Sequence, residues 1–89
     1  MDRHLWVARL IISDATKLKL STLHRLDWHD VNEALVGVRG LSYFWHDDPE
    51  RGIRAIVAIE VNGRNCIAVL YPVADPFGDT YALGSAYPQ

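Results

Sequence analysis

An arginine and a tyrosine at the outer ends of two apolar runs are the residues best placed to do chemistry. Arg54 begins the run RAIVAIEV, Tyr71 ends the run RNCIAVLY, and the dipeptide Asn62-Gly63 lies between the runs. A guanidinium binds phosphate oxygens, and a phenol in its reach can transfer a proton. The pair therefore predicts a catalytic site for a phosphate-containing substrate. The structural alternative is a cross-strand contact in which the arginine stacks on the ring.

The Asn62-Gly63 dipeptide determines how the two runs are positioned. Asn-Gly between β-rich segments is the strongest short-range signal for a hairpin with a two-residue type I′ turn. Counting outward from the turn places Arg54 opposite Tyr71, and alternation sorts the hairpin into two faces. The first face is apolar and requires a covering layer of helices; it consists of Ala55, Val57, Ile59, Val61, Cys66, Ala68 and Leu70. The second face presents Arg54 and Tyr71.

Four further residues are candidates for contacts with such a phosphate-containing substrate. Arg51 and Arg64 lie in predicted turns, where a cation can reach a phosphate, although turn arginines are usually only solvated. Tyr81 and Tyr87 are expected to extend the second face beside Tyr71, where their rings could stack on bases.

Three consecutive aromatic residues predict a docking surface. Tyr43, Phe44 and Trp45 fall in the β-prone segment 41–46, and three successive strand residues cannot all point inward. At least one ring is expected to meet another surface, so Tyr43 and Trp45 are predicted partner-binding residues.

Metal binding is not indicated by the histidines and acidic residues. His46 and Asp47 are neighbours on a strand and point to opposite faces, and Asp48 precedes Pro49 in ordinary turn chemistry. His46 as an acid or base stays an alternative. The single cysteine, Cys66, is expected to be a small core residue. We therefore predict no metal and no cofactor.

Size and composition indicate one soluble domain spanning residues 1–89. The chain is 49% hydrophobic and 22% charged, and it lacks the roughly 18 consecutive apolar residues of a membrane helix. The amino-terminal stretch MDRHLWVARLIIS has Arg9 within its apolar run, which is not typical of a signal peptide, so a cytoplasmic location is expected. A net charge of −2 excludes strong general affinity for nucleic acid, so RNA binding must rest on a local cluster of cations.

The elements that position these residues follow from periodicity. A strand over 5–12 precedes a helix capped by Ser13 that ends near His24, with Ala15, Leu18 and Thr22 on its buried stripe and Leu20 and Leu23 beside it. A second helix, capped by Asp27, buries Trp28, Val31, Ala34 and Leu35 and ends at Gly37 or Gly40. Strands follow over 41–46, over the two arms of the hairpin and over 80–87, the last one broken at Gly84. The predicted fold is α+β, with the order β-α-α-β-β-β-β and a helical hairpin on one face of an antiparallel sheet.

This order resembles the RelE-like toxins of bacterial type II toxin–antitoxin systems, and in particular their BrnT branch. The resemblance covers roughly residues 18–87 and rests on the segment RLDWHDVNEAL, the acidic turn DDPERG, the R-x-hydrophobic strand, the NGR turn and the final strand. It implies a metal-independent endoribonuclease that cuts messenger RNA and is held inactive by a cognate antitoxin. Arg54 matches the strand arginine of that family, Tyr71 is its expected neighbour, and Arg51 and Arg64 match by residue type alone.

The chain also departs from this family. Its last segment, TYALGSAYPQ, contains no Lys, Arg or His, and no Lys or Arg follows Arg64. A second function therefore stays open, in which the same fold is a non-catalytic interaction or regulatory module and pairs as a homodimer through the edge formed by Tyr43 and Trp45. A third, a metalloenzyme, lacks a set of ligands.

Overall fold

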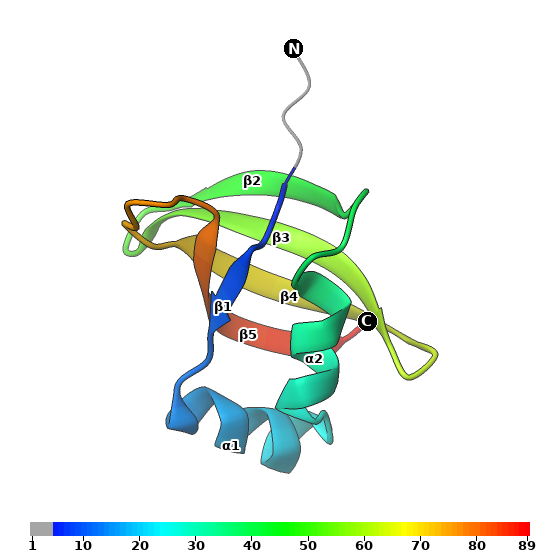
Figure 1. The fold of residues 1–89 in the computed structure, drawn as a ribbon. Helices are drawn as coiled ribbons and strands as arrows, with labels where there is room; N and C mark the ends of the chain where they lie inside the picture. Colours follow the sequence, from blue (N-terminus) through cyan, green and yellow to red (C-terminus); the bar gives the residue numbers. More distant parts are fainter. Residues whose placement is uncertain (1–4) are drawn as a thin grey trace.

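The protein is an α+β domain in which five strands and two helices follow the order expected from the sequence (Figure 1). The computed structural model describes residues 5–89; residues 1–4, which belong to the amino-terminal stretch considered above for a signal peptide, lie outside the described residues. The elements are β1 (Arg9–Ile11), α1 (Asp14–His24), α2 (Trp28–Leu35), β2 (Ser42–Asp48), β3 (Gly52–Val61), β4 (Arg64–Pro72) and β5 (Thr80–Pro88).

The five strands form one mixed sheet in the order β1-β5-β4-β3-β2. Strands β2 to β5 are antiparallel to their neighbours, whereas β1 runs parallel to β5, with Arg9 opposite Thr80. β1 is shorter than the predicted strand over 5–12, because its partner strand begins only at Thr80 and the chain then turns into α1. Ahead of β1, Val7 forms an isolated bridge with Val36. β2 lies at the edge of the sheet.

The central hairpin has the predicted turn and register. Asn62 and Gly63 have φ angles of 52° and 79°, the two positive values that a type I′ turn requires. Glu60 faces Asn65, and Ile56 faces Val69. The face predicted to be apolar is buried at every position, and its side chains pack with the helices: Ala55, Val57, Ile59, Val61, Cys66, Ala68 and Leu70.

Both helices cover this apolar face and begin at the predicted caps. The Ser13 side chain accepts a hydrogen bond from the Thr16 backbone N–H, and Asp27 accepts one from His29. In Figure 1 the helices meet at a corner, α1 against β5 and α2 against β3. Neither helix within residues 5–89 has the length and apolar character that crossing a bilayer requires.

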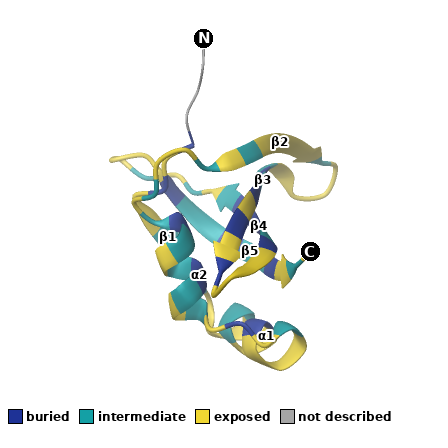
Figure 2. Ribbon diagram, turned by 90° about the vertical axis from the view of Figure 1, so that its right-hand side faces the viewer, coloured by how far each residue is buried: buried dark blue, intermediate teal, exposed yellow. Residues whose placement is uncertain are grey.

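The two helices differ in how well their buried sides were predicted. In α2, Val31 and Leu35 are fully buried, as expected, and Trp28 and Ala34 are partly buried. In α1 the predicted stripe is wrong: Leu18 is 63% exposed and Ala15 is exposed, and of the two leucines expected beside the stripe Leu20 is buried and Leu23 is exposed. Figure 2 shows α1 exposed along most of its surface, because it lies at the rim of the sheet and packs through a narrow face.

Strand β5 continues through Gly84 with an irregularity in its pairing. Leu83 pairs with Leu70, and Ser85 pairs with Val69, so Gly84 is an extra residue opposite the β4 backbone. Such a β-bulge changes which side chains share a face. Both Leu83 and Ala86 consequently point into the core although they are three residues apart.

Candidate functional site

The candidate site is centred on the guanidinium of Arg54, on the face of the sheet opposite the helices. Its Nε donates a hydrogen bond to Nδ1 of His46 at 3.1 Å, and its Nη1 donates to the Tyr71 hydroxyl at 3.3 Å. Nη1 also forms an ion pair with Oδ2 of Asp48 at 3.3 Å. The expected neighbours Arg54 and Tyr71 are thus in contact, and β2 adds two more polar side chains to them.

Strand register explains why these four side chains meet. His46 is directly opposite Arg54 in the β2–β3 pairing, and Asp48 is opposite Gly52 at the end of the same strands. Tyr71 reaches Arg54 from β4 on the other side of β3. Three neighbouring strands therefore contribute one polar cluster to the same end of the open face.

Hydrogen bonding perturbs the pKa values of this cluster. The bond to Tyr71 raises the pKa of the Arg54 guanidinium, against the opposing effect of burial. Burial raises the pKa of the Tyr71 phenol, but hydrogen bonds from Arg54 and Arg51 outweigh it, so the net shift is downward from 10.0. The Glu50 backbone N–H lowers the pKa of Asp48, with smaller contributions from Arg51 and Arg54. The site therefore holds a cation beside a phenol that ionises more readily than usual.

The contacts of Arg54 also fix the state of His46 and leave part of the guanidinium available. A guanidinium only donates hydrogen bonds, so Nδ1 of His46 must accept, which places the proton of the neutral ring on Nε2. Nε and Nη1 of Arg54 are engaged, whereas Nη2 makes no hydrogen bond within residues 5–89. The two N–H groups of Nη2 can therefore bind an oxyanion.

The ring of Tyr71 lies directly against Gly84. A β-carbon built on Gly84 would be 2.4 Å from Cε2 and 3.0 Å from Cδ2 of Tyr71. Because the residue at the bulge is a glycine, no side chain competes with the tyrosine ring for this place.

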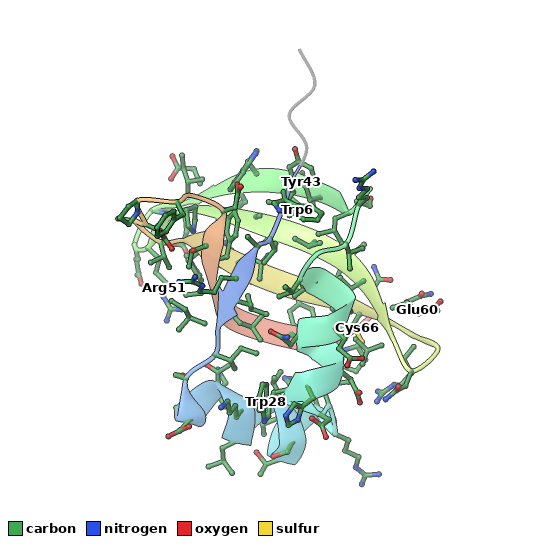
Figure 3. All side chains as sticks on the ribbon, in the orientation of Figure 1. Trp6, Trp28, Tyr43, Arg51, Glu60 and Cys66 are labelled. Atoms are coloured by element: carbon green, nitrogen blue, oxygen red, sulfur yellow. The ribbon has the colours of Figure 1, made fainter. Side chains whose placement is uncertain are left out.

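The two predicted turn arginines lie at opposite ends of the sheet. Arg51 belongs to the β2–β3 turn, close enough to Tyr71 to lower its pKa. Figure 3 shows Arg51 at the end of the sheet away from Glu60. Arg64 pairs with Val61 on the helix-covered face, about 23 Å along β3 from Arg54. Arg51 can therefore join Arg54 at one bound phosphate, and Arg64 cannot.

The two carboxy-terminal tyrosines are on different faces. Tyr87 is opposite Ile67 on the open face and is 38% exposed, with its ring 6.3 Å from that of His24. The expectation that Tyr81 extends this face is wrong, because Tyr81 is opposite Pro72 and packs against the core. Burial raises the pKa of Tyr81.

Tyr43 and Trp45 lie on the edge strand β2, on the helix side of the sheet. Their partners on β3 are the buried residues Val57 and Ala55. The two rings form an edge-to-face pair with centroids 6.1 Å apart, and Trp45 remains 44% exposed. Phe44, between them, points to the open face and is also exposed.

A metal centre is not found in the part of the chain that the structure describes, where no three His, Cys, Asp or Glu side chains are grouped to hold an ion. Cys66 is buried in the core, as predicted, and burial raises the pKa of its thiol.

Three residues of the cluster were not assigned to it from the sequence: His46, Asp48 and Gly84. A signal for the first two was present in the turn DDPERG. Three residues separate Asp48 from Gly52, and a hairpin loop of that length followed by a left-handed glycine has a defined register; Gly52 has a φ of 85°. Counting back from Gly52 would have placed His46 opposite Arg54. The contact of Gly84 with Tyr71 depends on the bulge, for which the sequence offered only an isolated glycine in a strand.

Compared with protein-family models, curated proteins and solved structures, the chain shows no match.

Proposed function

We propose that the protein is a metal-independent RNA endonuclease of the toxin–antitoxin type that acts in the bacterial cytoplasm. The observation that carries the proposal is the contact of Arg54 with Tyr71 on the open face of the sheet, where His46 orients the same guanidinium. The resemblance of the segments RLDWHDVNEAL and DDPERG to the BrnT branch of the RelE-like toxins agrees with it.

The cluster supplies the two functions that RNA cleavage by transesterification needs. The ribose 2′-hydroxyl attacks the adjacent phosphorus, the O2′–P bond forms, and the P–O5′ bond breaks to leave a 2′,3′-cyclic phosphate and a 5′-hydroxyl. The free N–H groups of Arg54 Nη2 donate to a non-bridging oxygen and stabilise the charge that builds up there.

Tyr71 is the residue that transfers a proton. Its phenol, with a lowered pKa, donates a proton to the departing 5′ oxygen and recovers one from water at this exposed face. The proton of the 2′-hydroxyl passes to water. Arg51 adds positive charge at the same end of the sheet, and Tyr87 offers a ring on which a base can stack.

A cognate antitoxin is the proposed protein partner. The exposed aromatic residues of β2, with Trp45 44% exposed, give it an apolar surface on the edge strand next to the site. An antitoxin that pairs along the β2 edge would contact Trp45 on the helix side and Phe44 on the open face, beside His46, and could close the open face to RNA.

A non-catalytic interaction module is the second candidate, and one observation favours it. The Asp48 carboxylate lies 3.3 Å from Arg54 and offsets the charge that would attract a phosphate. No Lys or Arg after Arg64 compensates for it. In that case the β2 edge would pair with a second copy of the chain or with another protein.

Induced expression in a bacterial host tests the proposal. Growth and the integrity of total RNA are followed for the wild type, for Arg54→Ala and for Arg39→Ala, an exposed arginine in the α2–β2 connection. The expected result is growth arrest with RNA decay in the wild type and in Arg39→Ala, and normal growth with Arg54→Ala. Soluble wild-type protein with intact RNA and normal growth would favour the interaction module.

A further inference from the structure

The β-bulge of β5 places a glycine, which has no side chain, where the ring of Tyr71 packs. Gly84 is the extra residue between the paired positions Leu83 and Ser85. A β-carbon there would overlap Cε2 of Tyr71 at 2.4 Å, far inside the separation of about 3.5–4.0 Å that two carbon atoms prefer.

The backbone does not explain why this residue is a glycine. Five other glycines have positive φ angles, between 71° and 85°, but Gly84 is not among them. Its backbone thus has no need of glycine's conformational freedom. The nearest backbone atom, the Val69 carbonyl oxygen, would be at an ordinary 3.5 Å from the added carbon. The conflict is therefore with the tyrosine ring alone.

The position of the ring sets the contact with the guanidinium. The distance from Arg54 Nη1 to the Tyr71 hydroxyl is 3.3 Å, already beyond the usual range of about 2.7–3.2 Å for an N–H···O bond. To avoid a β-carbon at residue 84 the ring must retreat by about 1 Å or more. A retreat of that size takes the side chain off its rotamer or into another one, and the hydroxyl moves with it.

We infer that Gly84 is a positioning residue, which holds the Tyr71 hydroxyl against Arg54 by leaving room for the tyrosine ring. It acts through Tyr71 and contacts no substrate. Its consequence for RNA cleavage rests on the function proposed above, whereas its effect on Tyr71 does not.

The test is the substitution Gly84→Ala, with Ser85→Ala on the same strand as the matched control. The ionisation of each tyrosine is followed by NMR on protein labelled at the tyrosine ring, and Tyr71→Phe assigns the Tyr71 signal. Arg54 contributes to lowering the pKa of this phenol. Loss of the contact between Arg54 and Tyr71 in Gly84→Ala should therefore raise the Tyr71 pKa toward the ordinary value of about 10. Ser85→Ala should leave it unchanged. An unchanged Tyr71 pKa in folded Gly84→Ala would overturn the inference.

A second pair of variants covers the case in which Gly84→Ala folds poorly. In a Tyr71→Ala background the added methyl group has room, so Gly84→Ala should lower the melting temperature in the wild type and not in that background. An equal decrease in both backgrounds would refute the steric role.

RNA decay separates this inference from the proposed function. If Gly84→Ala shifts the Tyr71 pKa and abolishes RNA decay, both stand. If the pKa shifts but the wild type cuts no RNA, the positioning role stands and the nuclease proposal fails.

Discussion

The salt dependence of RNA binding follows from the two cations that act on Tyr71 on the open face, Arg54 and Arg51. Arg54 and Arg51 lie at the same end of that face, and Arg64 is on the other face at the opposite end. Single-stranded RNA that contacts two cations should bind with a slope of log affinity against log salt of about −1.4. Raising the salt from about 50 to about 200 mM should then weaken binding about sevenfold.

Fluorescence anisotropy of a short labelled single-stranded RNA measures this slope, with a non-cleavable 2′-O-methyl backbone so that binding is separated from cleavage. Arg51→Ala should reduce the slope to about −0.7, so that the same change in salt weakens binding only about 2.6-fold. Arg64→Ala should leave the slope as in the wild type. A slope steeper than about −3, or an Arg64→Ala effect equal to that of Arg51→Ala, would show that RNA follows a different surface and would refute this reasoning.

Three other substitutions test the parts of the fold that support the site. His46→Ala should slow RNA decay but not abolish it, because His46 only orients Arg54; a loss as complete as that of Arg54→Ala would contradict this role. Gly63→Ala should destabilise the fold by about 1 kcal/mol, or about 4–8 °C in melting temperature, because Gly63 has a φ of 79°. Asp75→Asn should lower the melting temperature at neutral pH, with a difference that shrinks in acid. The Thr80 hydroxyl, with the Phe77 N–H, lowers the pKa of Asp75 from 3.8, so its stabilisation is present above that value and is lost as the pH falls through the lowered pKa. A difference that does not change with pH would be evidence against this linkage.

The central hairpin could be predicted from the sequence to the level of individual pairs. Asn62-Gly63 admits essentially one tight turn, and alternation on both arms then assigns each side chain to a face. The contact of Arg54 with Tyr71 was within reach for that reason.

The parts that were missed depend on tertiary packing. The buried face of α1 is set by its place at the rim of the sheet, so that Leu20 is buried and Leu18 is not. Tyr81 points to the core because it lies two residues before the buried Leu83 on β5, and the bulge at Gly84 changes which later residues share that face. An isolated glycine at position 84 does not reveal this bulge. His46 is opposite Arg54 because of the register that the three-residue loop 49–51 sets between β2 and β3. Such a loop is a weaker sequence signal for a hairpin than Asn-Gly.

The chemistry of the cleavage products tests the central claim most directly. Purified protein is incubated with single-stranded RNA in the presence of a chelator, and the ends of the fragments are identified by mass spectrometry. Attack by the 2′-hydroxyl at the Arg54–Tyr71 site predicts 2′,3′-cyclic phosphate and 5′-hydroxyl ends, absent with Arg54→Ala. Fragments with 3′-hydroxyl and 5′-phosphate ends, or cleavage that the chelator abolishes, would contradict the account.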